Sequence, residues 1–292
     1  MASRDKAAKP RAKMGVPKIQ GFMAQNANTM VLLYRRRGKE TFVVRYTYAD
    51  KTGGARHKLS VGSRFTGRFY PSRCSLSPDG KHFIYFVMGG RQAGYKEQHY
   101  CWTAMCRPPD LKALFFLPHN DTWGGGGLFL NNRTVVVDGC MYDDKAAMER
   151  LNLSSVDGVN VIVQSGYVPL PEPAKWPKPV DTGWRPSGML SHMQLSTVRK
   201  KTAKRANLVA RAREAKSFPG YYDLWEYTLL GRTGRTSFLD DVMKQATWAD
   251  FDRQGRLVVA IGHTLQIYKS PREGMSEKPT RIIDLEEATA PA

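Results

Sequence analysis

The sequence predicts an all-β protein, and three observations support this prediction. Short apolar runs rich in Val, Ile, Phe and Tyr recur along the 292 residues, and turn residues separate them at hairpin spacing. The 26 glycines and 17 prolines favour many turns over a bundle of long helices. Apolar residues make up 41% of the chain, which is enough for a buried core and excludes a chain that is disordered throughout.

The N-terminal segment has no pattern of folded structure. Residues 1–18 combine Lys, Arg, Ala and Pro without apolar periodicity, so we expect a basic disordered tail that reaches residue 27. No run approaches the roughly 18 apolar residues of a membrane span, and no apolar segment follows the basic start. Because the chain also has only four cysteines, the sequence predicts a soluble, cytoplasmic protein rather than a disulfide-stabilised one.

Strands are predicted from residue 29 onward. The clearest hairpin spans Cys74–Val87, where the turn Ser77-Pro78-Asp79-Gly80 has Pro at a position with φ of about −65° and Gly at a position with positive φ. We expect five further strands on either side of this hairpin, at Thr29–Tyr34, Thr41–Tyr48, Arg56–Val61, Tyr100–Met105 and Ala113–Leu117.

Two further hairpins have the same organisation. The first joins Leu128–Leu130 to Thr134–Val137 through the turn Asn131-Asn132-Arg133. The second begins a unit of four consecutive antiparallel strands, which has the size of one propeller blade. These four strands are Trp248–Asp252, Arg256–Ile261, Leu265–Tyr268 and Arg281–Leu285.

The three hairpins share one pattern, in which a short strand is followed by a turn with Gly or Asn and by an apolar strand that ends at small residues. They comprise Ser75–Val87, Leu128–Val137 and Trp248–Ile261. This pattern resembles the inner hairpin of a blade in WD-repeat-like and TolB-like β-propellers. The resemblance implies a small β-propeller of four or five blades over residues 28–292, with Val159–Pro169 as a place for the fifth blade.

A long segment separates the second hairpin from the third. Tyr221–Tyr227 and Thr236–Leu239 fit the outer strands of the blade that contains Leu128–Val137, so we expect Asp138–Gly220 to be an insertion in that blade. The first half of the insertion is rich in proline and is predicted to be extended. Its second half, Gly188–Phe218, is predicted to be a basic helix that ends at a Pro-Gly pair.

The net charge of +19 is confined to two segments. Residues 1–73 contain 17 Lys and Arg against three acids, and residues 185–216 contain nine against one. The predicted helix therefore has almost no acids for i,i+4 pairs, so its cations repel one another and favour an anionic partner. The candidate partner- or phosphate-binding residues are Arg35, Arg36, Arg37, Arg199, Lys200, Lys201, Lys204, Arg205, Arg211 and Arg213. The candidate apolar docking residues of the same helix are Met189, Met193, Leu195 and Val198.

These basic segments suit two functions. In the first, the chain is a non-enzymatic scaffold in a larger assembly, and the basic helix and the N-terminal tail dock protein partners. In the second, the chain binds nucleic acid without reading its sequence, because Lys6–Lys18, Arg35–Arg37 and Arg199–Lys216 contact phosphates. A hydrolase with its site at the propeller axis is a third hypothesis. The sequence leaves the oligomeric state open.

Other motifs predict structure rather than chemistry. Gly124–Gly127 is followed by a strand and by no Lys-Ser or Lys-Thr, so we interpret it as the start of a strand in a crowded place and not as a phosphate-binding loop. Cys101 and Cys106 lack the second pair that a structural zinc site needs, and we expect buried free thiols. The six histidines and the paired acids show no metal or catalytic spacing. The sequence therefore predicts no catalytic residue, no metal and no cofactor.

Overall fold

The computed structural model describes most of the chain in separate stretches. These are residues 17–36, 40–49, 57–89, 100–119, 122, 124–138, 155–164, 184–186, 198–203, 206–212, 225–231, 234–235, 239–270 and 277–291. Most of them lie in strands, and their helices are the short α2 (Asp240–Gln245), α3 (Leu285–Ala288) and the 3₁₀ turn η1 (Pro71–Arg73). Within these stretches, no helix has the length and apolar character needed to cross a membrane.

The first eight strands form one antiparallel sheet. They are β1 (Lys18–Met23), β2 (Thr29–Arg35), β3 (Glu40–Thr47), β4 (Lys58–Phe69), β5 (Ser75–Leu76), β6 (Phe83–Gly89), β7 (Cys101–Cys106) and β8 (Ala113–His119). The strand order is β1-β2-β3-β4-β6-β7-β8, and the short β5 pairs with β6. The long strand β4 pairs with β3 along its first part and with β6 at its end, so it joins β1–β4 to β5–β8.

Three smaller sheets follow along the chain. The second sheet contains β9 (Gly127–Asn131), β10 (Thr134–Asp138), β11 (Ser155–Val156) and β12 (Val159–Gln164), and its β10–β12 pairing is parallel. The third contains β13 (Trp184–Pro186), β14 (Val198–Ala203), β15 (Ala206–Ala212), β16 (Trp225–Gly231) and β17 (Gly234–Arg235). The fourth contains β18 (Trp248–Phe251), β19 (Leu257–Ile261), β20 (Thr264–Tyr268) and β21 (Arg281–Asp284). Within the described residues all four sheets are open.

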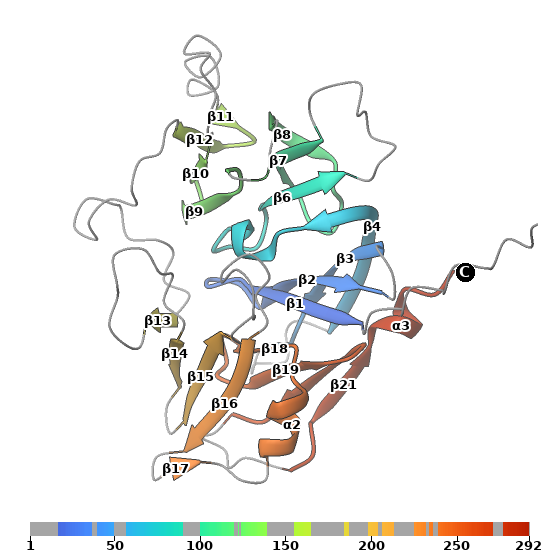
Figure 1. The fold of residues 1–292 in the computed structure, drawn as a ribbon, viewed down its shortest axis with the longest axis vertical. Helices are drawn as coiled ribbons and strands as arrows, with labels where there is room; N and C mark the ends of the chain where they lie inside the picture. The colour runs from blue at the N-terminus through green and yellow to red at the C-terminus, as the bar shows by residue number, and fades with distance from the viewer. Residues whose placement is uncertain are drawn as a thin grey trace, which may run out of the picture.

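The sheets follow one another in an arc (Figure 1). β9 and β10 lie at one end of the arc, followed by β6, then by β1–β3, then by β18 and β19, with β15 and β16 at the other end. We divide the first sheet into two groups of strands, β1–β4 and β5–β8, and treat each smaller sheet as one group. First strands of neighbouring groups are in contact: β1 packs against β5 and β18, and β5 packs against β9. Segments far apart in the sequence therefore become neighbours.

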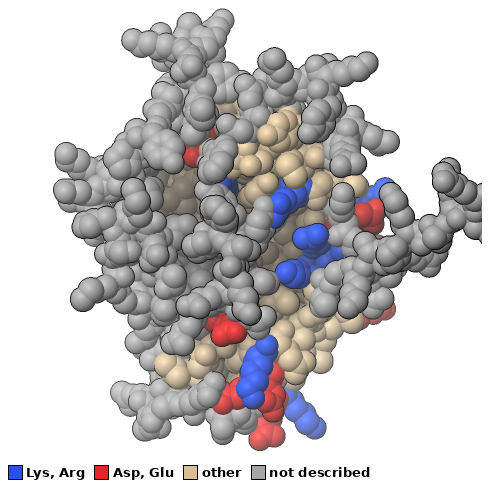
Figure 2. Space-filling view, viewed as in Figure 1, with Lys and Arg blue, Asp and Glu red and all other residues tan. Residues whose placement is uncertain are grey.

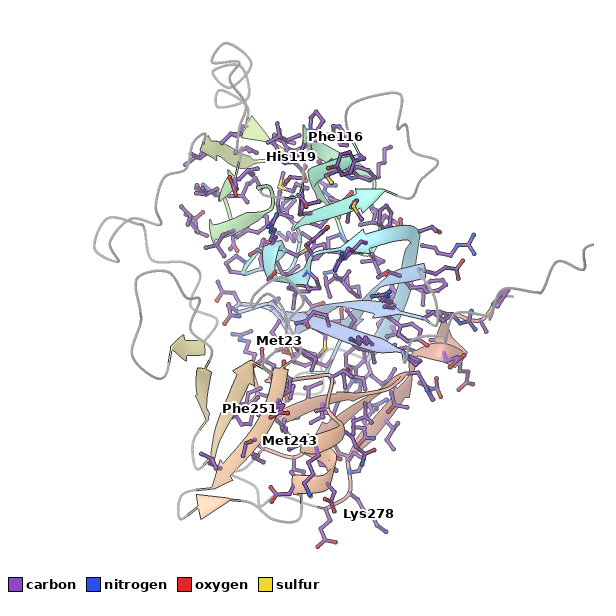
Figure 3. The ribbon with its side chains drawn as sticks, in the orientation of Figure 1. Met23, Phe116, His119, Met243, Phe251 and Lys278 are labelled. Atoms are coloured by element: carbon purple, nitrogen blue, oxygen red, sulfur yellow. The ribbon has the colours of Figure 1, made fainter. Side chains whose placement is uncertain are left out.

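The hydrophobic core is divided into layers between neighbouring groups of strands. Tyr34 of β2 and Val258 of β19 share one fully buried layer. Met105 of β7 and Phe129 of β9 share another. Side chains fill the space between neighbouring ribbons in Figure 3. His119 of β8 is buried, whereas Phe116 of the same strand is 52% exposed. Each group of strands is thus held by its neighbours rather than by a single central core.

Several sequence predictions are confirmed. β18, β19, β20 and β21 form four consecutive antiparallel strands, as the blade-sized unit predicted. The hairpins β5–β6 and β9–β10 also occur where they were expected, and Gly80 has a φ of +71°, as its turn requires. The strands expected between residues 29 and 117 correspond to β2, β3, β4, β7 and β8. All-β is therefore the correct fold class.

The predicted N-terminal tail extends too far. Residues 1–16 lie outside the described residues, but β1 begins at Lys18 and pairs with β2 along its whole length. Ile19, Gly21 and Met23 are buried in alternation with more exposed neighbours, which is the period of a strand. This alternation spans only six residues, and the basic residues before it obscured it.

The predicted basic helix is wrong where the structure describes its residues. Val198–Ala203 and Ala206–Ala212 are β14 and β15, two strands of an antiparallel hairpin. Leu208 is fully buried, lies opposite Leu229 of β16 and belongs to the same core layer as Leu257 of β19. Ala, Lys and Arg favour helices intrinsically, but pairing with β16 and packing against the fourth sheet override that propensity.

Residues 138–220 are not an insertion within a single blade. β16, which includes the end of the predicted outer strand Tyr221–Tyr227, pairs with β15 in the third sheet, whereas β9 and β10 belong to the second. The other predicted outer strand, Thr236–Leu239, lies outside the described residues except for Leu239. Val159–Pro169, the expected place for a fifth blade, contributes β12 (Val159–Gln164), which pairs with β10 of the second sheet instead of forming a blade of its own within the described residues. The apolar pattern locates these strands correctly, yet it does not specify which strands pair.

Candidate functional site

Hairpin turns from four groups of strands meet at one face of the molecule. These turns are residues 24–28 (β1–β2), 77–82 (β5–β6), 131–133 (β9–β10) and 252–256 (β18–β19). The guanidinium of Arg253 donates to the carbonyl of Asn26 at 3.2 Å, and the Asn26 N–H donates to the carbonyl of Pro78 at 2.7 Å. The Asp79 N–H donates to the side-chain oxygen of Asn132 at 2.9 Å. We call these linked turns the turn face.

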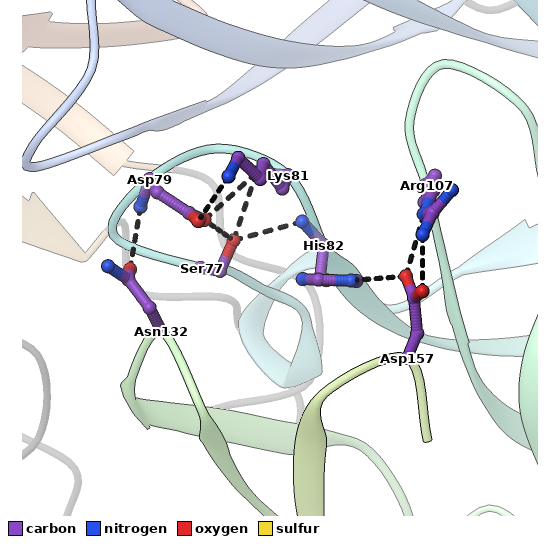
Figure 4. A network of polar contacts seen from close by, with 7 residues as sticks. All are labelled: Ser77, Asp79, Lys81, His82, Arg107, Asn132 and Asp157. Carbon is purple, nitrogen blue, oxygen red and sulfur yellow. Dashed lines mark hydrogen bonds and ion pairs between the residues drawn. The ribbon is translucent and has the colours of Figure 1, made fainter.

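The β5–β6 turn owes its shape to Ser77 and Gly80. The buried Ser77 hydroxyl accepts the N–H groups of Lys81 at 3.1 Å and His82 at 2.9 Å, and it donates to Asp79 at 2.7 Å (Figure 4). Gly80 provides the positive φ, and a Cβ at this position would overlap with Cγ2 of Thr29. The turn therefore sends Lys81 toward solvent and His82 into the protein.

Asp157 ties the second sheet to the first. It forms the two-residue β11–β12 turn with Gly158, and both residues have positive φ, as a type I′ hairpin requires. Its carboxylate accepts both Nε and Nη2 of Arg107 and lies 2.7 Å from Nε2 of His82 (Figure 4). The bidentate Arg107 contact, aided by His82, lowers the pKa of Asp157 below its usual range.

A cavity of about 620 Å³ opens between these turns. Arg45 of β3 lines it together with Lys81, Arg107 and Arg133, which lie in turns or directly after strands of the first and second sheets. Two acids, a histidine and an asparagine complete the lining, namely Asp79, Asp157, His82 and Asn132. Every described lining residue is charged or polar, and the Lys and Arg side chains outnumber the acids by four to two.

The β18–β19 turn contains a buried ion pair. The carboxylate of Asp252 is fully buried and lies 2.7 Å from Nε of Arg256, whose guanidinium covers the ring of Tyr48 at 4.9 Å. Burial raises the pKa of Asp252, while Arg256 opposes this rise. The Arg253 N–H donates to the Tyr48 hydroxyl at 3.3 Å. The Asp252–Arg256 pair, packed on Tyr48, therefore holds the turn against the chain after β3, and Arg256 is not available to a ligand.

Charge is unevenly distributed over the visible surface. Figure 2 shows described Lys and Arg side chains near the middle of one face, next to uncharged residues. Acidic and basic side chains lie side by side at the lower end, where Figure 1 places α2. There Lys244 of α2 lies 2.8 Å from Asp241, so these two charges neutralise each other.

The sequence-predicted binding residues do not come together at the cavity. Arg35 ends β2, and Arg36 lies 3.9 Å from Glu286 at the start of α3. Arg199, Lys200 and Lys201 lie in β14, Arg211 lies in β15, and Val198 begins β14. The remaining candidates lie outside the described residues, namely Arg37, Lys204, Arg205, Arg213, Met189, Met193 and Leu195. None of the seven candidates that the structure describes lines the cavity.

Sequence reasoning missed the cavity cations. Lys81 directly follows the predicted Ser-Pro-Asp-Gly turn, and Arg133 lies within the predicted Asn-Asn-Arg turn. Basic residues at the ends of predicted hairpin turns were thus the sequence signal from which these cavity residues could have been predicted. That signal does not reveal that His82 and Asp157, 75 residues apart, are in contact.

The other motifs behave as structural features. A Cβ at Gly125 would overlap with the ring of Phe86, which confirms the crowding expected at Gly124–Gly127. Cys101 and Cys106 are buried free thiols, as predicted, and burial raises the pKa of Cys106. In the described part of the chain, no cluster of three or more His, Cys, Asp or Glu has the geometry to hold a metal ion.

Comparison of the chain with protein families, with curated proteins and with solved structures gives no match.

Proposed function

We propose that the chain is a small, non-enzymatic β-propeller scaffold that docks a protein partner within a larger assembly. Five groups of strands follow one another along the chain, namely β1–β4, β5–β8, β9–β12, β13–β17 and β18–β21. As blades they would give a five-bladed propeller, and their arrangement in an arc with touching first strands supports this interpretation (Figure 1). An experimentally determined structure with the same groups stacked in two flat layers would contradict it.

The linked turns of the turn face are the observation that supports docking most strongly. Three hydrogen bonds join turns from four groups of strands, so their backbones are held in fixed relative positions. Lys81, Asn132 and Arg253 are exposed on these turns. Recognition residues are often presented by loops on a rigid framework, because little conformational entropy is then lost on binding.

Charge reversal on the turn face tests docking. Full-length protein with Lys81→Glu and Arg253→Glu should lose a protein partner that the wild type retains at physiological salt after nuclease treatment. Lys112→Glu with Lys269→Glu is the matched control, because these exposed lysines lie outside the linked turns. Thermal unfolding of both variants verifies folding. A partner that persists after turn-face reversal, or that nuclease removes, would contradict the proposal.

Nucleic-acid binding is a second candidate because one strand pair places like charges opposite each other. Arg185 of β13 lies directly opposite Lys200 of β14, and β13, β14 and β15 contain no acid. Directly opposed like charges destabilise a sheet, and phosphates would offset their repulsion. Arg199 and Lys201 flank Lys200 in β14.

The salt dependence of binding tests this second candidate. Affinity for oligonucleotides of unrelated sequence should fall steeply with salt, and Arg199→Gln with Lys200→Gln and Lys201→Gln should reduce the log–log slope by about 3. Removing the three exposed lysines Lys112, Lys244 and Lys269 should leave the slope almost unchanged. Absence of binding at low salt would exclude this function.

A further inference from the structure

The cavity on the turn face has a lining that selects a charged ligand. Each described lining residue is charged or polar, so the cavity favours a polar or charged ligand over an aliphatic or aromatic group. Its volume of about 620 Å³ exceeds the space that a few ordered waters need. A ligand that matches this lining is compact, hydrophilic and multiply charged.

The two acids of the cavity already have partners. Asp157 binds Arg107 and His82, and Asp79 accepts the Ser77 hydroxyl and the N–H of Lys81. Because these contacts partly neutralise the carboxylates, they repel an incoming anion less than isolated acids would. The acids therefore shape the site more than they oppose a negative ligand.

Three cations remain available to the cavity. Lys81 is 71% exposed, and its ammonium forms only a long ion pair with Asp79, at 3.7 Å, so it is able to turn toward a ligand. Arg133 is exposed and has no carboxylate partner among the described residues, and Arg45 has a long 3.4 Å contact from Nε to the Thr29 hydroxyl. These cations come from β3, the β5–β6 turn and the β9–β10 turn. An anion that reaches all three must carry charge at several points.

We propose that this cavity binds a compact polyphosphate group of the diphosphate or triphosphate class. Phosphate oxygens match the planar donors of Arg and the point charge of Lys, and a chain of phosphates spreads negative charge over several contacts. Nδ1 of His82, which is buried at the cavity lining without a hydrogen-bond partner, is a further polar atom beside the site. The proposal does not depend on the partner-docking function, because it concerns a small ligand and a different measurement.

Calorimetric titration of the full chain with inorganic triphosphate tests the site. Lys81→Gln with Arg133→Gln should weaken binding at least about tenfold, because both cations are lost from the cavity. Lys112→Gln with Lys269→Gln removes the same total charge outside the cavity and should change affinity less than about twofold. All four side chains are exposed, and thermal unfolding verifies that each variant remains folded.

Asp157→Asn tests the site by an expected increase in triphosphate affinity. If the cavity cations had only a structural role, this substitution would not increase the affinity. Asn tolerates the positive φ of this turn, and the change removes a negative charge while it frees Arg107. Triphosphate affinity should rise about fivefold in this variant.

Three results would overturn the proposal. The first is triphosphate affinity in the wild type no higher than that of sulfate. The second is equal loss of affinity in the cavity variant and in its matched control. The third is tighter binding of hexaglutamate than of triphosphate, which would make the cavity a site for an acidic peptide. A partner retained by the wild-type protein in any of these cases would leave the docking function intact.

Discussion

The β5–β6 and β18–β19 turns share two hydrogen bonds of their first residue, although the β5–β6 turn is one residue longer, and they use charge in opposite ways. In both, the first residue accepts the N–H of the fifth residue through its side chain. In both, its carbonyl accepts the N–H of a glycine at 2.8 Å, and that glycine has positive φ. The first residues are Ser77 and Asp252, and the glycines are Gly80 and Gly255.

The difference lies in the charge of the first residue. Asp252 pairs with Arg256 of its own turn, so this cation is occupied and folded onto Tyr48. Ser77 is neutral, so Lys81 has no acid at the equivalent position and extends into the cavity. When the first residue of such a turn is an acid, it pairs with the cation of its own turn and stabilises the fold. When the first residue is a serine, the cation of the turn is left at the cavity, where a ligand can reach it.

The largest expected effect is on stability, at the acidic turn. Asp252→Ala should lower the free energy of unfolding by about 3–5 kcal/mol, because it leaves the half-buried Arg256 without its carboxylate. Ser77→Ala should cost about 1–3 kcal/mol, because it removes a hydrogen-bond acceptor but unpairs no charge. Urea unfolding measures both values, and equal losses would show that the ion pair does not distinguish the turns.

Substitution of the two turn glycines by alanine should lower the free energy of unfolding by different amounts. Gly80→Ala should cost about 2–5 kcal/mol, because the new Cβ combines the strain of positive φ with an overlap with Thr29. Gly255→Ala should cost about 1–2 kcal/mol, because its Cβ would lie 3.4 Å from the Ser270 hydroxyl and only the strain remains. The same urea titration compares them. A larger loss for Gly255→Ala would contradict the packing described at the β5–β6 turn.

Exchanging the first residue of one turn for that of the other should exchange how the two turns use their cation. Ser77→Asp places an acid where Asp252 lies in its turn, so Lys81 should pair within the turn and triphosphate affinity should fall about fivefold. Asp252→Ser is the reciprocal change outside the cavity lining and should leave triphosphate affinity within about twofold. Calorimetric titration measures both, and unchanged affinity in Ser77→Asp would break the comparison.

The smallest effect concerns the pH dependence of the Asp157 contacts. Because Arg107 and His82 lower the pKa of Asp157, its contacts stabilise the folded state above the ordinary carboxyl pKa of about 3.9, and this stabilisation is lost as pH falls through the lower folded-state value. The wild type should therefore have a higher urea midpoint than Asp157→Asn at pH 6, and the difference should shrink below about pH 4. A difference that grows on acidification would contradict the assignment.

The sequence alone determined the turns and many of the strand positions of this protein. Gly80 and Gly255 predict turns, because these positions have positive φ and glycine adopts positive φ without strain. The residue runs between such turns have the apolar content of buried strands. These are short-range constraints, so the β5–β6 hairpin and the meander β18–β21 were predictable from the residues that form them.

Only the tertiary structure decided which strands pair and where the cavity lies. Val198–Ala203 and Ala206–Ala212 have helical propensity, but pairing with β16 and packing of Leu208 against the fourth sheet make them strands. The turn face depends on contacts between residues 52 to 227 positions apart, such as Asn26 with Pro78 and Asn26 with Arg253. Propensity and turn chemistry act over a few residues, whereas these contacts exist only after the core layers have placed the sheets side by side.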